Sequence, residues 1–595
     1  MSSLIATRLN AIRTEMANND LDAFIVPRAD EYLGEYVPAH NERLYWATGF
    51  TGSAGMAIIL KGSAAIFTDG RYTVQVRQQV SAGLFEYLSL TDVPQIQWLI
   101  DTLPTHSRVG IDSRLHSFNW FQKAQSAFHK ADITLVTLDE NPIDIHWNNR
   151  PEASSSPAIL FSHDYAGESS QDKRTRIAKN IQHIGADAAL ITALDSFCWL
   201  LNLRGQDVPR LPVILGTALL YKDSRVTLFT DVTKLPQGIN EHVGNGVDFL
   251  PEAELASSLK ALSNKILLCD PDASNAWSQL TAKAANVTLL PASCPIALEK
   301  AQKNTIELAG FTACHIRDGV AVSRFLAWLD NEVQHHRLHN EATLSDKLES
   351  FRLEDPLYQE PSFDTISALG SNAAMCHYNH NNGTPATMLL NSLYLVDSGA
   401  QYFDGTTDVT RTIAIGEIND EQKKMVTLVL KGHIALDQAK FPQGTTGQQL
   451  DAFARQFLWQ HGYDYDHGTG HGVGHFLNVH EGPQRIAKAG QPVALLPGMI
   501  VSNEPGYYRE SEFGIRLENL VAVQICEALK DSERDMLEFK ALTLIPMDLR
   551  LIDNSLLTVT EINWLNDYHQ RVFSALSPFI EGIELNWLTN ATQAI

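Results

Sequence analysis

The chain has 595 residues, 44% of them hydrophobic, and a formal net charge of −23 from 46 basic and 69 acidic side chains. That length accommodates about four domains of roughly 150 residues each. The acidic balance, without a cluster of Lys or Arg, argues against binding to nucleic acid or an anionic membrane and otherwise favours solubility.

The first segment, residues 1–20, alternates apolar and charged side chains and predicts an amphipathic helix. It lacks the continuous apolar core of a signal peptide, and no run approaches the roughly 18 apolar residues of a transmembrane helix. The six cysteines are scattered without a CxxC pair. This pattern is typical of free thiols in a reducing compartment, so we expect a cytoplasmic protein.

Two similar units follow each other in the first half of the chain. Each has an apolar strand, a segment containing a tryptophan (Trp46 or Trp199) and two further strands. The predicted strands are 21–26, 56–60 and 65–70 in the first unit and 186–192, 213–221 and 226–231 in the second. The repeat predicts two α/β domains, residues 1–155 and 156–297, joined by a linker at 141–157 that is rich in Pro, Asn and Ser.

A third region, residues 298–535, contains most of the motifs, and it opens on a helical pattern of apolar residues over 297–332. The remaining residues, 536–595, predict one further small unit. Its expected elements are a strand at 541–546 and a helix capped by Thr560 whose apolar face presents Trp564, Leu565 and Tyr568.

Two aspartates of the third region are predicted to lie side by side. An apolar strand ends at Asp397, and Asp408 begins the next strand-like segment. A turn at Asp404-Gly405 joins the two strands and can bring both carboxylates to one place.

Histidines and glutamates follow in similar settings. The glycines between the histidines exclude a helix, and in an extended chain histidines spaced by four residues share one face. Two later strand-like segments each present one glutamate. The residues are His467, His471, His475 and His480 in the glycine-rich segment, then Glu504 and Glu518.

Each of these residues also has a plain structural interpretation, as a turn residue or a satisfied histidine. Together they indicate a metal centre, because buried carboxylates repel one another unless a positive charge of about +3 to +4 lies between them. Two divalent cations supply that charge and activate a hydroxide as nucleophile. A carboxylate-rich shell with one imidazole fits Mn²⁺ best, and Co²⁺ or Zn²⁺ can substitute.

The order Asp397, Asp408, His471, Glu504, Glu518 resembles the five-ligand pattern of the pita-bread metallopeptidases, which include methionine aminopeptidase, prolidase, aminopeptidase P and creatinase. The spacings of 11 residues between the aspartates and 14 between the glutamates match it. The surrounding sequence motifs, such as Asp-Ser-Gly-Ala-Gln-Tyr and Asn-Val-His-Glu-Gly-Pro, look like those of the long, three-domain, cytosolic type of aminopeptidase P. This resemblance covers the whole chain.

The resemblance implies two creatinase-like domains before a pita-bread catalytic domain with a C-terminal extension, an α/β (α+β) architecture. It implies that the five ligands hold two metal ions and that Glu504 also acts as general base. It further implies that His480 is a proton shuttle and that His377 and His467 line the proline side. The resemblance places Arg516 beside the last glutamate, with Tyr508 as a further support.

The expected activity is removal of the first residue from peptides with proline at position two, by a homodimer. Prolidase, which cleaves only dipeptides, is the nearest alternative, and a catalytically inactive module that binds proteins is a more remote one. One departure from the family pattern is His475, where relatives carry a small residue. We expect it to be a spectator.

Overall fold

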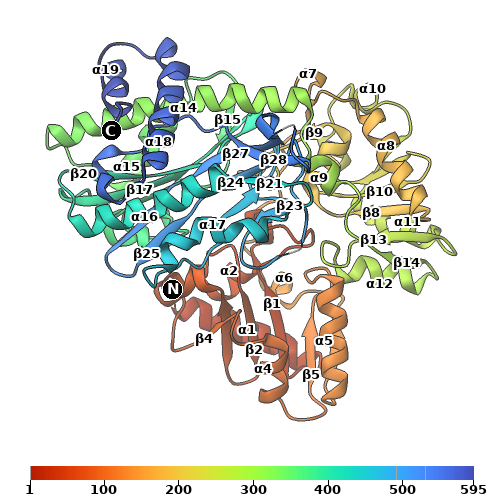
Figure 1. The fold of residues 1–595 in the computed structure, drawn as a ribbon. Coiled ribbons are helices and arrows are strands. Elements are labelled where there is room, and N and C mark those ends of the chain that lie inside the picture. The colour runs from red at the N-terminus through yellow and green to blue at the C-terminus, as the bar shows by residue number, and fades with distance from the viewer. Residues whose placement is uncertain (1, 491, 530) are drawn as a thin grey trace. The chain divides into compact units, whose positions relative to one another are not determined.

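The computed structural model describes residues 2–490, 492–529 and 531–595. It divides into two compact units (Figure 1). One comprises the chain up to His163 together with Glu168–Ala297, and the other comprises Asp164–Gly167 and Leu298–Ile595. No helix among the described residues has the length and apolar composition needed to cross a membrane.

Two sheets form the first unit. The first contains β1 (Ala23–Pro27), β2 (Met56–Leu60), β3 (Ala64–Thr68), β4 (Glu86–Ser89), β5 (Arg108–Ile111) and β6 (Thr134–Thr137). The second contains β8 (Ala188–Ile191), β10 (Thr217–Tyr221), β11 (Val226–Phe229), β12 (Val247–Leu250), β13 (Ile266–Cys269) and β14 (Thr288–Pro291). A separate short ladder pairs β7 (Ile159–Leu160), which precedes the second sheet in sequence, with β9 (Leu203–Arg204), which follows β8.

The two sheets have the same topology, so the predicted internal repeat is confirmed. Their strand orders are β4-β3-β2-β1-β5-β6 and β12-β11-β10-β8-β13-β14. In each sheet the first strand in sequence pairs antiparallel with the next one and parallel with the fifth, as β1 does with β2 and β5 and β8 does with β10 and β13.

Amphipathic helices flank both sheets. The predicted N-terminal helix is α1 (Ser2–Asn18), which buries Ile5, Leu9, Ile12 and Met16. The others include α2 (Arg43–Thr48), α3 (Thr73–Gln79), α4 (Gln95–Thr102), α5 (Phe118–Lys130), α8 (Ser170–His183), α9 (Leu194–Leu201), α10 (Ile239–Val243), α11 (Leu255–Ala261) and α12 (Ala276–Ala284).

The predicted linker at 141–157 is partly wrong, because its first residues form α6 (Pro142–His146). Asn141 caps this helix by accepting a hydrogen bond from the Ile143 N–H, and proline is favourable at the first helical position. Ile143 is fully buried in the core of the first domain. Apolar burial therefore overrides the loop-like composition here.

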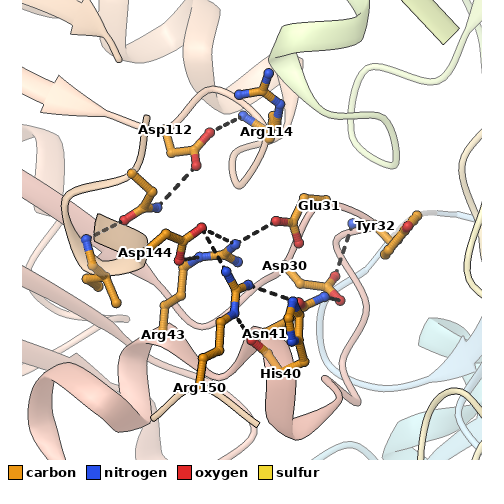
Figure 2. A network of polar contacts seen from close by, with 12 residues as sticks. Asp30, Glu31, Tyr32, His40, Asn41, Arg43, Asp112, Arg114, Asp144 and Arg150 are labelled. Carbon is orange, nitrogen blue, oxygen red and sulfur yellow. Dashed lines mark hydrogen bonds and ion pairs between the residues drawn. The ribbon is translucent and has the colours of Figure 1, made fainter. Parts of the chain in front are cut away.

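A network of charged side chains fixes α2, α6 and the loop before α2 (Figure 2). The Arg43 guanidinium donates to Asp144 at 2.8 Å and to Glu31 at 2.7 Å. Arg150 lies 3.2 Å from the same Asp144 carboxylate. Asp30 is bound by the Asn41 amide and by backbone N–H groups. Most of the charge in this cluster is paired within it.

The second unit combines small sheets with flanking helices. Its strands are β15 (Tyr358–Pro361), β16 (Ile366–Leu369), β17 (Ser392–Ser398), β18 (Ala400–Tyr402), β19 (Gly405–Thr406), β20 (Val409–Ile415), β21 (Lys440–Pro442), β22 (Gly470–Gly472), β23 (Glu481–Ile486), β24 (Ile500–Asn503), β25 (Gly506–Arg509), β26 (Phe513–Arg516), β27 (Asn519–Ile525) and β28 (Met536–Ala541). They form the sheets β15-β18-β19, β16-β17-β20, β21-β28-β27-β24-β22-β23 and β25-β26.

The helices of this unit are α14 (Thr305–Gln334), α15 (Glu341–Arg352), α16 (Asp420–Asp437), α17 (Gly447–Trp459), α18 (Val559–Leu576) and α19 (Gly582–Ala591). The single helix predicted over 297–332 is broken into α13 (Ala297–Ala301) and α14. The reason is Asn304, whose side chain starts α14 in a capping box with Glu307.

Two predictions for the C-terminal residues are wrong. The strand is β28, earlier than the expected 541–546, and it pairs with β27 in the main sheet. The helix cap is Thr558, which forms a capping box with Glu561, and not Thr560. The final helices α18 and α19 pack against α14 at one end of this unit (Figure 1). The C-terminal residues therefore share the core of the catalytic region.

Candidate metal centre

Asp397 and Asp408 come from neighbouring strands of one sheet. Asp397 lies near the end of β17, and Asp408 immediately precedes β20. The antiparallel register places Asp397 opposite Thr410, two residues beyond Asp408. Both side chains are buried. The predicted pairing of these strands is therefore confirmed.

Glu504 and Glu518 flank one end of a second strand pair. The register of β24 and β27 places Asn503 opposite Asn519, so the residues just outside both strands lie together. The Glu518 N–H donates to the Thr410 carbonyl at 3.1 Å, which joins this sheet to β20. The two pairs of carboxylates thus converge from different sheets.

His471 faces these carboxylates from β22. Its Nδ1 donates to the Gly472 carbonyl at 2.9 Å. Its Nε2 then points toward the acids, 3.4 Å from Asp408 Oδ2 and 3.5 Å from Glu504 Oε1. One ligand atom from each of Asp408, His471 and Glu518 lies within 4.8 Å of the other two. This geometry can hold a cation.

Burial and mutual repulsion dominate the electrostatics of the cluster. Burial raises the pKa of Asp397 to about 6 against the opposing effect of Arg516, and Asp408 adds to the rise. Burial and the neighbouring carboxylates also raise the pKa values of Glu504 and Glu518. Burial alone would lower the pKa of His471, but Asp408 and Glu504 outweigh it and raise this pKa to about 9.

The residues present fit divalent cations. Asp397 Oδ1 is buried and has no hydrogen-bond partner among the described residues, although its Oδ2 has one. A buried carboxylate oxygen without a donor is unfavourable unless a cation binds it. Carboxylate oxygens with one imidazole nitrogen are suitable ligands for hard or borderline divalent ions.

Arg516 contacts Asp397 and reaches the last glutamate indirectly. Its Nη2 lies 2.5 Å from Asp397 Oδ2, and its Nε donates to Thr410 Oγ1 at 3.1 Å. Thr410 Oγ1 in turn donates to Glu518 Oε2 at 2.7 Å. Arg516 therefore contacts Asp397 directly and is linked to Glu518 through the Thr410 hydroxyl.

Tyr508 connects Arg516 to His467. The Tyr508 hydroxyl accepts from Arg516 Nη1 at 2.6 Å and lies 2.8 Å from His467 Nε2. His377 follows Cys376, whose carbonyl accepts from Arg516 Nη2 at 3.4 Å. The segments that carry His377 and His467 therefore both reach the arginine that holds Asp397.

His480 and His475 contact different aromatic rings. The His480 ring lies edge-on to the His471 ring, with centroids 4.5 Å apart. His475 instead lies in a turn after β22, buried, with its ring 5.6 Å from that of Phe311 on α14. The prediction that the histidines share one face is wrong for His475, because the strand ends at Gly472.

Sequence reasoning missed two hydroxyl side chains of the centre. Ser502 accepts from the His471 N–H at 3.0 Å and donates to Glu504 Oε1 at 3.1 Å. Thr410 bridges Arg516 and Glu518 as described. Each lies two residues from a ligand, Glu504 or Asp408, so the strand period of two could have placed it on the ligand face.

Models of known families match nearly the whole chain. Metallopeptidase family M24 matches residues 309–524, and the C-terminal region of peptidase M24 matches 535–595. Models of the creatinase/prolidase N-terminal domain match residues 8–143 and 149–307.

Individual relatives are similar over their full length. A probable Xaa-Pro aminopeptidase P of Coccidioides posadasii (strain RMSCC 757 / Silveira) is 39% identical over 99% of this chain and 99% of its own. Aminopeptidase P1 of Arabidopsis thaliana is 37% identical with the same coverage. The crystal structure of X-prolyl aminopeptidase from Caenorhabditis elegans, a cytosolic enzyme with a di-nuclear active site, is 31% identical and has a TM-score of 0.95 over 99% of this chain and 100% of that one.

Sequence identity of this degree over the full length of the relatives shows which family the chain belongs to. The chain is a hydrolase that belongs to the Xaa-Pro aminopeptidase P family of the M24 metallopeptidases.

Proposed function

We propose that this chain hydrolyses the peptide bond between the first residue of a peptide and a proline at position two, with two divalent metal ions. The observation that carries the proposal is the likeness to a di-nuclear X-prolyl aminopeptidase over 99% of the chain. The proposed ligands of the ions are Asp397, Asp408, His471, Glu504 and Glu518. When bound, such ions polarise a carbonyl group and lower the pKa of water.

The side chains of this centre have distinct proposed roles. Glu504, oriented by the Ser502 hydroxyl, accepts a proton from the attacking water as general base. His480 transfers a proton near the scissile carbonyl, from its position beside His471. Arg516 and Thr410 orient Asp397 and Glu518, as partners of metal ligands commonly do.

Proline specificity is proposed to come from the residues around the leaving nitrogen. Proline has no N–H and a fixed φ, so a site shaped for its ring excludes ordinary residues. His377 and His467 are proposed to line that side. The hydrogen bond between His467 and Tyr508 supports this, because it fixes one of these rings relative to Arg516.

Finer properties follow from the same family. We propose Mn²⁺ as the native ion, with Co²⁺ or Zn²⁺ as substitutes, because carboxylate oxygens dominate the ligands. We also propose a cytoplasmic homodimer and a division into domains at 1–155, 156–297, 298–535 and 536–595. A monomeric mass in light scattering would contradict the dimer.

Prolidase chemistry is the second candidate, and two observations disfavour it. The match to the C-terminal region of peptidase M24 covers residues 535–595. The relatives that align along the full chain are named aminopeptidase P. A non-catalytic binding module is disfavoured because all five proposed ligands are present.

The test is to incubate metal-stripped protein, with and without Mn²⁺, with Arg-Pro-Pro, Gly-Pro and Ala-Ala-Ala, and to follow products by mass spectrometry. We expect release of Arg from Arg-Pro-Pro only with metal and little release from Ala-Ala-Ala. Cleavage of Gly-Pro alone would move the assignment to prolidase, and no cleavage with any divalent ion would favour the binding module.

A further inference from the structure

Arg411, one residue after Thr410 on β20, is buried and donates hydrogen bonds in several directions. Its acceptors are uncharged oxygens from four parts of the second unit. They are the carbonyls of Thr410 (2.9 Å), Glu518 (2.7 Å), Ile545 (2.7 Å) and Pro546 (3.0 Å), the Asn519 side chain (2.8 Å) and the Tyr568 hydroxyl (2.9 Å). A planar guanidinium with five N–H groups is suited to hold several segments in one geometry.

Two of these acceptors belong to the metal centre. Arg411 Nη1 binds the carbonyls of both Thr410 and Glu518, which come from different sheets. It therefore fixes the distance between β20, which follows Asp408, and the backbone of Glu518. Distances between a metal and its ligands tolerate changes of only about 0.2 Å.

Three of the other acceptors, Ile545, Pro546 and Tyr568, come from the C-terminal part of the chain. Tyr568, on α18, is 1% exposed and also donates to the Ile545 carbonyl at 2.8 Å. Its ring stacks on that of Trp564, with centroids 5.3 Å apart and an interplanar angle of 5°. Trp564 Nε1 donates to Asp437 on α16 at 2.8 Å.

A second contact secures α18 at its first turn. The Lys431 ammonium on α16 lies 2.6 Å from the Glu561 carboxylate. The helix is thus held to α16 at two places, and Tyr568 extends from it to Arg411. This contact is distant along the helix from the Arg411 hydrogen bonds, so it can be disturbed separately.

We propose that Tyr568 is a positioning residue for the metal centre, which acts through Arg411 to hold Glu518 in register with Asp408. The helix α18 then helps to position the active site. The inference rests on the proposed ligand roles of Asp408 and Glu518. It predicts that loss of one hydroxyl group on α18 weakens metal binding at a centre to which α18 contributes no ligand.

The test compares Tyr568→Phe with Glu561→Gln in the full chain. Phenylalanine keeps the stacked ring and removes only the hydroxyl group, whereas Glu561→Gln removes the negative charge that pairs with Lys431 and leaves Arg411 untouched. Affinity for Mn²⁺ is measured by competition with a chromogenic chelator, and thermal unfolding of the metal-free proteins is measured in parallel.

We expect Tyr568→Phe to weaken Mn²⁺ binding by about 10- to 100-fold, as loss of a supporting partner typically does. We expect Glu561→Gln to lower the unfolding temperature without changing Mn²⁺ affinity. Unchanged affinity in Tyr568→Phe, or an equal loss in Glu561→Gln, would overturn the proposal. Arg411→Lys, which keeps the charge but lacks the planar set of donors, should weaken binding in the same way and serves if Tyr568→Phe does not fold.

Glu518→Gln in the same titration separates this inference from the proposed function. If Glu518→Gln loses Mn²⁺ and Tyr568→Phe does not, the ligand role stands and the positioning role is overturned. If Glu518→Gln binds Mn²⁺ as the unaltered chain does, the ligand set itself is wrong and the inference fails with it.

Discussion

The molecule contains two clusters of charged side chains whose negative charges are balanced in different ways. Around Arg43 (Figure 2), the carboxylates of Glu31 and Asp144 are paired with guanidinium groups. Although burial by itself raises the pKa of Asp144, Arg43 and Arg150 outweigh it and lower this pKa. The cluster is neutralised by its own residues and therefore stabilises the fold.

In the second unit the carboxylates mainly face one another. Burial and repulsion from neighbouring carboxylates raise the pKa values of Asp397, Glu504 and Glu518, against the opposing charges of Arg516 and His471. Such a cluster is incomplete without an external cation. The comparison teaches that the balance of charge within a cluster, more than its burial, separates a structural site from a site for metal ions.

The largest expected effect is on activity. Glu504→Gln removes the proposed general base and should lower the rate by roughly 100- to 10,000-fold at saturating Mn²⁺. The same change should leave the metal-free protein as stable or more stable, because one of several repelling charges is gone. Steady-state kinetics and thermal unfolding of the metal-free protein measure both effects.

Glu512→Gln, on an exposed turn, is the matched control and should change neither quantity. A Glu504→Gln protein that keeps most of its activity would remove the role assigned to this carboxylate. One that is markedly less stable without metal would contradict the repulsion argument.

For the cluster around Arg43, whose charges are paired within it, the expected effect is on the free energy of unfolding. The Asp30 carboxyl is buried, and burial, with a smaller contribution from Glu31, raises its pKa to about 6. Since the folded state binds this proton more tightly than the unfolded state, stability falls as the pH rises from about 4 to about 6 and is then constant. A rise in pKa of this size corresponds to a loss of unfolding free energy on the order of 3 kcal/mol.

Chemical denaturation of the unaltered chain and of Asp30→Asn at pH 4, 5, 6 and 7 tests this. The difference in unfolding free energy between them should shift in favour of Asp30→Asn as the pH rises through this window. Asp92→Asn, at an exposed position, should show no such trend. A pH-independent difference for Asp30→Asn would show that the carboxyl titrates normally.

Removing the positive charge of Arg43 from the same cluster should also destabilise the protein. Arg43→Met leaves Glu31 and Asp144 without their main partner. The arginine is 3% exposed but both carboxylates are 28% exposed, so we expect a loss of about 2 kcal/mol, between the values for surface and buried pairs. Mn²⁺ affinity should not change.

The control is Arg225→Met, which breaks an exposed pair with Asp223 and should cost well under about 1 kcal/mol. Equal losses in the two variants, measured by urea denaturation, would mean that the Arg43 cluster contributes no more than a surface pair. A loss of Mn²⁺ affinity in Arg43→Met would contradict its purely structural assignment.

The smallest effect on chemistry is expected at His475. Because its ring packs on Phe311 of α14, His475→Gln should leave Mn²⁺ affinity and kinetics unchanged. It should lower stability by about 1–3 kcal/mol, as changes in a packed core do. A changed metal affinity would show that this histidine interacts with the centre.

Local pattern accounts for what could be predicted. The strands at 23–27 and 56–60 were predictable because runs of apolar residues between turn signals indicate buried strands. The failures at 141–157 and at 541–546 have the same origin. At 141–157 the composition indicated a loop, but Ile143 is buried in a helix. At 541–546 an apolar run indicated a strand, but the strand that pairs with β27 is β28, which ends at Ala541.

The sequence by itself determined the chemical composition of the centre. The types, order and spacing of the proposed ligands can be read from the sequence, and so can the repeat of the first two domains. These features depend on residue type and short-range periodicity, which any window of the chain contains.

Only the tertiary structure decided which residues meet. Asp408 Oδ2 and His471 Nε2 lie 3.4 Å apart, Arg516 contacts Asp397 directly and Glu518 only through Thr410, and Tyr568 contacts Arg411 across 157 positions. Such contacts depend on strand register and on the packing of whole elements, so no local pattern encodes them. Tertiary structure also decides whether a cluster of charges is paired internally or needs a cation. The reason is that pairing depends on which opposite charges lie within a few ångströms of each other.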